Sequence, residues 1–209
     1  MALQQAPLVS LAKGLANVPG GQFGELLESR LSPDYYTLLK SGRVFTAAVA
    51  AINPTAFTGG AAGTPILGVF NPLNSGVDLV LIDVLLGIRT TGSAAVTLDF
   101  NHWLVAQGSV AITGTQSVAR NMYSGAQSGS VSYAMLNTAN TGALASNLIR
   151  PSVSVGLTAV TAVTNVSLLR DELKGSIIIA PGNYYAFGAS ATPTAASIDA
   201  AAIWAEIPV

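Results

Sequence analysis

Val77–Ile88 reads VDLVLIDVLLGI and is the strongest strand signal in the chain. Aliphatic residues dominate it, many of them β-branched, and a dense turn signal, Asn71–Gly76 (NPLNSG), stands directly before it. A helix is disfavoured here, because Gly bounds the run closely and β-branched side chains favour extended backbone. We therefore expect a strand, and the other expected elements are placed around it.

The next strand is expected at Ala95–Val105 (AVTLDFNHWLV), which alternates apolar and polar residues over its first half, as a half-buried strand does. Similar patterns occur at residues 43–49, 65–70, 153–155, 163–166, 176–179, 183–188 and 201–207, with shorter ones near 119–122 and 132–136. About eight strands separated by turn signals predict an all-β domain, a jelly roll or β-sandwich over residues 44–209. A parallel α/β sheet is disfavoured, since no helical segments alternate with these strands. Trp204 and Phe187 are expected in the core.

Residues 1–43 differ in texture and are expected to form an N-terminal arm with short helical pieces. Leucines recur near helical-turn spacing before a Pro19–Gly21 break, a short helix is predicted at residues 23–28, and Ser32-Pro33 has the pattern of a helix start. That helix would run to about Lys40 and end at Gly42. The arm would either anchor the protein to a partner or fold against its own domain. The apolar residues expected to attach it are Leu8, Leu11, Leu15, Phe23, Leu26 and Leu27.

The composition favours a surface that neighbouring subunits cover. Of the 209 residues, 9% are charged, against about 25% in typical soluble domains. A neutral surface rich in Ser, Thr and Asn is the alternative. The net charge is −1, and Arg89, Arg120 and Arg150 stand singly, so nucleic-acid binding is not expected. The N-terminal residues lack a signal-peptide pattern, and we expect no membrane segment, since that needs about twenty mostly apolar residues.

Catalytic chemistry is not expected from these residues, and we predict that the protein is not an enzyme. The chain has no Cys and one histidine, His102, which is more often a packed or surface residue than a base. Asp78 and Asp83 would point to opposite faces of a regular strand. The charged run Arg170–Lys174 is expected to be a solvated loop. Motifs for metal, phosphate or other cofactor binding are missing, and neither a metal nor a cofactor is predicted.

The middle of the chain, residues 107–151, is rich in Ser, Thr, Asn, Gly and Ala. A loop of this length without structure is unusual in a compact domain. We expect either an insertion with short strands or a surface that a partner orders.

Three segments resemble tailed-bacteriophage virion proteins. Ser32–Thr46 (SPDYYTLLKSGRVFT) is similar to a Tyr-rich helix that leads into a Gly-Arg-x-Phe strand, and Phe70–Leu81 (FNPLNSGVDLVL) to an Asn-Pro turn before an apolar strand. Ile179–Ala186 (IAPGNYYA) resembles a Pro-Gly turn that leads into a strand. The resemblance implies a capsid cement (decoration) protein: a jelly-roll subunit, usually a homotrimer, at the capsid surface of the virion. The implied partners are the major capsid protein and further copies of the chain.

Two other functions stay open at this point. A tail, fibre or receptor-binding component of the same kind of particle could expose residues 107–150 as a variable tip. A lectin-like, carbohydrate-binding β-sandwich would need exposed Tyr or Trp side chains. A major capsid protein is less favoured, because the chain is short and lacks that fold's long helix.

Overall fold

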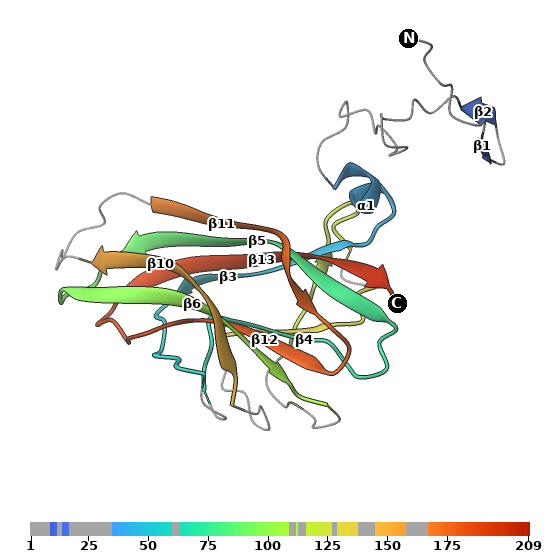
Figure 1. Ribbon diagram of the computed structural model, residues 1–209. Helices are drawn as coiled ribbons and strands as arrows, with labels where there is room; N and C mark the ends of the chain where they lie inside the picture. Colours follow the sequence, from blue (N-terminus) through green and yellow to red (C-terminus); the bar gives the residue numbers. More distant parts are fainter. Residues whose placement is uncertain are drawn as a thin grey trace, which may run out of the picture. The chain divides into compact units, whose positions relative to one another are not determined.

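The computed structural model describes residues 9–11, 14–16, 35–59, 63–108, 112, 116–126, 129–137, 145–157 and 167–209. The chain divides into two compact units, residues 1–36 and 37–209, and each is described by itself. The second unit carries all of the long strands (Figure 1).

The first unit contains an antiparallel pair of short strands, β1 (Val9–Leu11) and β2 (Gly14–Ala16). The helix that the leucine spacing predicts is therefore wrong here, since Leu11 and Leu15 both lie in strands. Short isolated helices are marginal in water, and Gly14 lowers helix propensity further. Leu8, Phe23, Leu26, Leu27 and the helix predicted at residues 23–28 lie outside the described residues.

A short helix, α1 (Tyr36–Lys40), stands before the first long strand. It ends as the sequence predicts, at Gly42, whose φ of 71° is the left-handed conformation that glycine adopts readily. Gly42 N–H donates to the Leu39 carbonyl at 3.0 Å, and Arg43 N–H to the Leu38 carbonyl at 3.1 Å. These two bonds form a Schellman cap, so the turn into the first long strand is fixed by backbone bonding.

Two antiparallel sheets form the second unit and pack face to face (Figure 1). One sheet has the strand order β10-β6-β12-β4-β9-β7, and the other has the order β11-β5-β13-β3-β8. The strands are β3 (Val44–Ile52), β4 (Leu67–Phe70), β5 (Val77–Thr90), β6 (Val96–Ala106), β7 (Gln116–Ser117), β8 (Arg120–Asn121), β9 (Tyr133–Leu136), β10 (Asn147–Leu157), β11 (Ser167–Ile179), β12 (Asn183–Ala189) and β13 (Ser197–Pro208).

The strand order is that of a jelly roll. When the short strands β7 to β9 are set aside, β3-β13-β5-β11 faces β4-β12-β6-β10. The chain changes sheets at each step between these strands except from β6 to β10, which are neighbours in one sheet. This is the arrangement of two interlocked Greek keys. The predicted all-β, jelly-roll or sandwich fold is confirmed.

The segment between β6 and β10 adds short strands to the edges of both sheets. β9 and β7 continue the six-stranded sheet beyond β4, and β8 pairs with β3 in the other sheet. The strands expected near residues 119–122 and 132–136 are therefore present. The strand expected at residues 163–166 lies outside the described residues.

The core lies between the sheets and holds both aromatic residues expected there. Trp204 is fully buried beside Phe45, with ring centroids 6.4 Å apart, and Phe187 stacks on Phe100 at 5.9 Å. Full burial of one such side chain contributes about 1.5–3 kcal/mol. The apolar run that dominates the sequence, β5, supplies Leu79, Leu81, Val84, Leu86 and Ile88 to this core.

Strand β5 is irregular, which corrects one expectation. Its inward residues alternate through Leu81 and resume at Val84, and its register with β13 shifts at the same place. Two residues instead of one lie between Leu81 and Val84, so the strand has a β-bulge there. As a result Asp78 and Asp83 lie on the same, outer face, whereas in a regular strand they would lie on opposite faces. Asp83 is nevertheless buried, because Arg170 from β11 covers it and donates to Asp83 Oδ2 at 2.8 Å.

Candidate functional site

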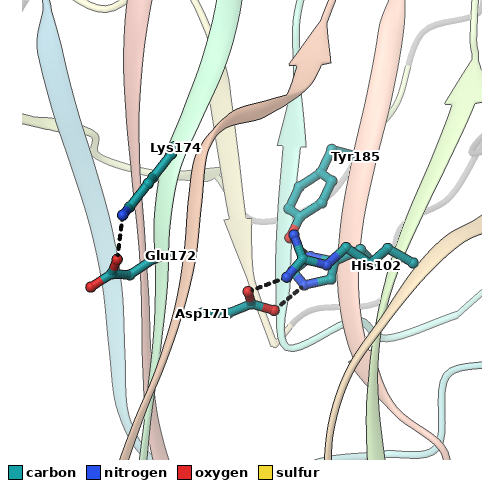
Figure 2. A network of polar contacts seen from close by, with 6 residues as sticks. His102, Asp171, Glu172, Lys174 and Tyr185 are labelled. Atoms are coloured by element: carbon teal, nitrogen blue, oxygen red, sulfur yellow. Dashed lines mark hydrogen bonds and ion pairs between the residues drawn. The ribbon is translucent and has the colours of Figure 1, made fainter.

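Four polar side chains meet where the edge strands of the two sheets, β10 and β11, close one side of the sandwich (Figure 2). His102 comes from β6, Tyr185 from β12, Asp171 from β11 and Arg150 from β10. We call these four residues the His102 cluster. His102 Nδ1 lies 2.7 Å from the Tyr185 hydroxyl, and Nε2 lies 2.9 Å from Asp171 Oδ2. Arg150 Nη2 lies 2.8 Å from Asp171 Oδ1.

Strand alternation explains why these groups face one another. His102 follows Leu98 and Phe100 on the inner face of β6, and Tyr185 precedes Phe187 on the inner face of β12. In β11, Asp171 is paired with the core residue Val84 of β5. Each of these polar groups therefore occupies a position that the strand pattern assigns to the core.

The partners of His102 define its tautomer. An ionised carboxylate can only accept, so Nε2–H donates to Asp171, and Nδ1 accepts from the Tyr185 O–H. Burial lowers the pKa of His102, although the hydrogen bond and charge of Asp171 act to raise it. The ring is neutral near pH 7, and its contact with Asp171 is a hydrogen bond rather than a pair of full charges.

Burial and hydrogen bonding also shift the pKa values of Tyr185 and Asp171. Burial raises the pKa of Tyr185 well above its ordinary value, so the phenol stays protonated. Partial burial acts to raise the pKa of Asp171. Hydrogen bonds from Ser152 and His102, together with the charge of Arg150, outweigh this effect and hold that pKa below its ordinary value. All three pKa shifts favour the protonation states in which these hydrogen bonds form, namely neutral His102, ionised Asp171 and protonated Tyr185.

The outward side chains of β11 form a separate ionic group. Arg170, Glu172 and Lys174 are exposed to solvent as expected, but this segment is a strand and not the expected loop. These residues lie in β11, with Asp171 turned inward and Glu172 and Lys174 turned away from it (Figure 2). Arg170 contacts Glu172 at 3.1 Å, and Lys174 contacts Glu172 at 3.0 Å. Leu169 and Leu173 pack against the core, but the charged Asp171 between them interrupts the apolar alternation that predicts a strand.

A small cavity of about 260 Å³ lies beside the cluster and is lined by Ser152, Asp171, Phe187 and neighbouring residues of β5, β10 and β11. A general base in it would need a free nitrogen or oxygen within reach of a substrate proton. His102 is completely buried with both ring nitrogens engaged, and Asp171 is bonded to three neighbours. The cluster is therefore built to join strands of the two sheets.

A second buried carboxylate, Glu206, contacts the segment that leads into β9. Glu206 of β13 accepts hydrogen bonds from Ser130 Oγ at 2.7 Å, Val131 N–H at 3.2 Å and Ser132 Oγ at 3.3 Å. These residues lead directly into β9 of the other sheet. Glu206 therefore holds the segment between β6 and β10 against the five-stranded sheet. This contact could not be predicted from the sequence, because Ser-rich segments are equally common in loops.

The described part of the chain holds neither a metal-binding cluster nor a membrane-spanning helix. No group of three or more His, Cys, Asp or Glu side chains among those residues could hold a metal ion. None of the helices described is long and apolar enough to cross a membrane.

Of the six residues expected to attach a partner, the structure describes two, Leu11 in β1 and Leu15 in β2. They lie on paired strands, where Leu11 is opposite Gly14 and Leu15 is opposite Ser10.

Comparisons of the chain with protein-family models, with curated proteins and with solved structures found no match. The fold and the polar contacts are therefore the basis for a functional proposal.

Proposed function

We propose that this protein is a non-enzymatic structural subunit of a virus particle, a capsid cement (decoration) protein that binds the phage head as a homotrimer. One observation carries the non-enzymatic part. The buried ionisable groups of the His102 cluster form hydrogen bonds with one another, and these bonds link neighbouring strands. Such a cluster stabilises a fold and leaves nothing poised for a substrate.

The virion part of the proposal draws on the fold and the composition. Jelly rolls occur in viral capsid proteins, and also in lectins and cupins, so the fold alone is insufficient. The segments that resemble phage virion proteins and the charge content of 9% favour the particle subunit. A subunit that works by contact has little need of exposed charge where neighbours cover it.

Attachment would combine several modest contacts. A specific protein interface buries about 1,200–2,000 Å². A trimer presents three copies of each contact, and tethered sites bind at high effective concentration. The proposed anchor is the N-terminal arm with Leu8, Leu11, Leu15, Phe23, Leu26 and Leu27, and the jelly roll would stand on the shell.

Sedimentation with empty capsids, assembled from the cognate major capsid protein, tests this function. The full chain should pellet with the capsids and saturate, whereas a variant that lacks residues 1–30 should stay in the supernatant with an unchanged melting temperature. Undiminished pelleting of the shortened chain would remove the anchor from the proposal. A full chain that never pellets would remove the cement function.

A carbohydrate-binding function is the second candidate, because two tyrosines are exposed in the segment between β6 and β10. Tyr123 is 59% exposed and Tyr133 is 43% exposed. Aromatic faces of this kind can stack on sugar rings. Binding to a glycan array that is lost in Tyr123→Ala or Tyr133→Ala would favour a lectin over a cement protein.

A further inference from the structure

The outer face of the five-stranded sheet carries a patch of small apolar side chains. Ala48 of β3 is paired with Ala201 of β13, which is paired with Leu85 of β5. In the next row, Asp199 is paired with Gly87. The small side chains leave a shallow groove of about 340 Å³ over the three strands. We call this groove and its rim the Ala48 face.

The water-facing side of an antiparallel sheet normally carries polar side chains. On the Ala48 face, Ala48 and Ala50 are exposed, and Leu85 and Ala201 are partly exposed. These positions alternate with core residues such as Ala47 and Leu86, so they are the outward set of their strands. An apolar centre of this kind resembles the middle of a protein interface.

Two ion-paired groups lie along the rim of the Ala48 face, and each is balanced in charge. Arg89 and Asp199 pair at 3.3 Å at one end of the groove. On the β11 side, Asp83, Arg170, Glu172 and Lys174 form linked pairs. Each group has as many cations as anions, and neither favours a partner of strong net charge. A partner that is itself nearly neutral fits this rim.

The chain is such a partner, with nine basic and ten acidic residues. A second copy also offers apolar side chains to fill the groove, since Val118, Met122 and Tyr123 are 53%, 44% and 59% exposed. Contacts around a three-fold axis are heterologous, so two different surfaces of the subunit meet. A groove on one subunit and exposed apolar side chains on the next meet this requirement.

Association through the sheet edges is disfavoured. β8 is two residues long, and β11 has a register shift between Glu172 and Ile177, where Lys174 and Gly175 have positive φ. β10 carries Pro151 and two further register shifts. Short edge strands, bulges and proline prevent strand addition. The faces of the sheets are left as the available surfaces.

We propose that the Ala48 face is the surface on which a second copy of the chain docks. Its role in a virion rests on the proposed function, but the contact itself does not. The groove receives apolar side chains of the neighbouring copy, and the balanced rim sets their orientation.

Ala48→Arg tests this contact, with Ala106→Arg as the matched control. Both alanines are exposed and lie in strands, Ala48 in the five-stranded sheet and Ala106 in the six-stranded one. Light scattering over a range of concentrations should give the wild type and A106R a multiple of the chain mass. A48R should dissociate, with Kd raised about tenfold or more, because an unpaired charge would be buried in the contact. Equal melting temperatures would show that A48R is folded.

Several results would overturn the proposal: a monomeric wild type, an A48R variant that associates as tightly as the wild type, or equal losses in A48R and A106R. If A48R fails to fold, Ala50→Arg replaces it, since Ala50 is also exposed on this face. Sedimentation with empty capsids separates the two proposals. A wild type that associates through this face but does not pellet refutes the cement function alone. A monomer that pellets refutes the docking face and the homotrimer, and leaves capsid binding in place.

Discussion

At the scale of single residues, His102 occupies a core position and still satisfies both of its ring nitrogens. A buried polar group costs little only when its hydrogen bonds are made. The sequence predicted that this histidine is packed or exposed rather than catalytic, and it is packed. Its partners could not be predicted, because Tyr185 and Asp171 are 83 and 69 residues away in the chain.

Replacing Tyr185 by Phe removes the donor to His102 Nδ1 and leaves that nitrogen buried and unpaired. We expect a loss of about 1–3 kcal/mol in the free energy of unfolding. Chemical denaturation measures it, and Tyr133→Phe is the control, since Tyr133 is exposed and its substitution should change stability by less than about 0.5 kcal/mol. Equal stabilities of Y185F and Y133F would contradict the role given to the His102 cluster.

The pKa shifts predict how stability depends on pH. The folded pKa of His102 is lowered, so its contribution is complete above the ordinary value of 6.5 and is lost as the pH falls below it, where the unfolded chain binds the proton first. Asp171, also lowered, adds a further loss below 3.8. Tyr185, which is raised, causes a loss above 10.0, where only the unfolded chain ionises readily.

Unfolding between pH 7.5 and 5 tests the first of these losses. His102 is the one histidine of the chain, so His102→Gln should flatten the stability curve in this window while lowering its overall level. An unchanged pH slope in H102Q would show that other groups control it.

At the scale of elements, β12 approaches the segment before β4 so closely that glycine is required. A Cβ at Gly188 would lie 2.7 Å from Cβ of Phe57, whose buried ring cannot withdraw easily. Gly188→Ala should therefore cost about 1–3 kcal/mol through overpacking. Gly156→Ala is the matched control in β10, where a Cβ meets nothing within 4 Å, and it should be neutral or slightly stabilising. Equal melting temperatures for the two variants would contradict the packing described.

Strands β5 and β6 could be predicted, because the order of apolar and polar residues along a strand reflects which of its faces is buried. The bulge in β5 could not, because it depends on how β13 pairs with it. The Arg170–Lys174 part of β11 is not predicted as a strand, since a partner that makes its charges acceptable, Asp83, comes from another strand. The sequence therefore predicts most of the long strands but not the His102 cluster, which only the folded sheets bring together.

At the scale of the whole molecule, two carboxylates, Asp171 and Glu206, join parts of the jelly roll that belong to different sheets. Asp171 does this beside β10 and β11, and Glu206 does it beside the segment that leads into β9. Both use hydrogen bonds inside the fold, which leaves the outer faces for contact with other molecules. The proposed docking of copies through the Ala48 face uses one of these outer faces.

Electron microscopy of empty capsids incubated with the full chain tests the proposed function most directly. We predict additional density on the outer surface of the shell, with three jelly rolls around each attachment point, and bare shells in the control without the protein. Shells that stay bare at saturating protein, or density confined to a tail, would contradict the cement function.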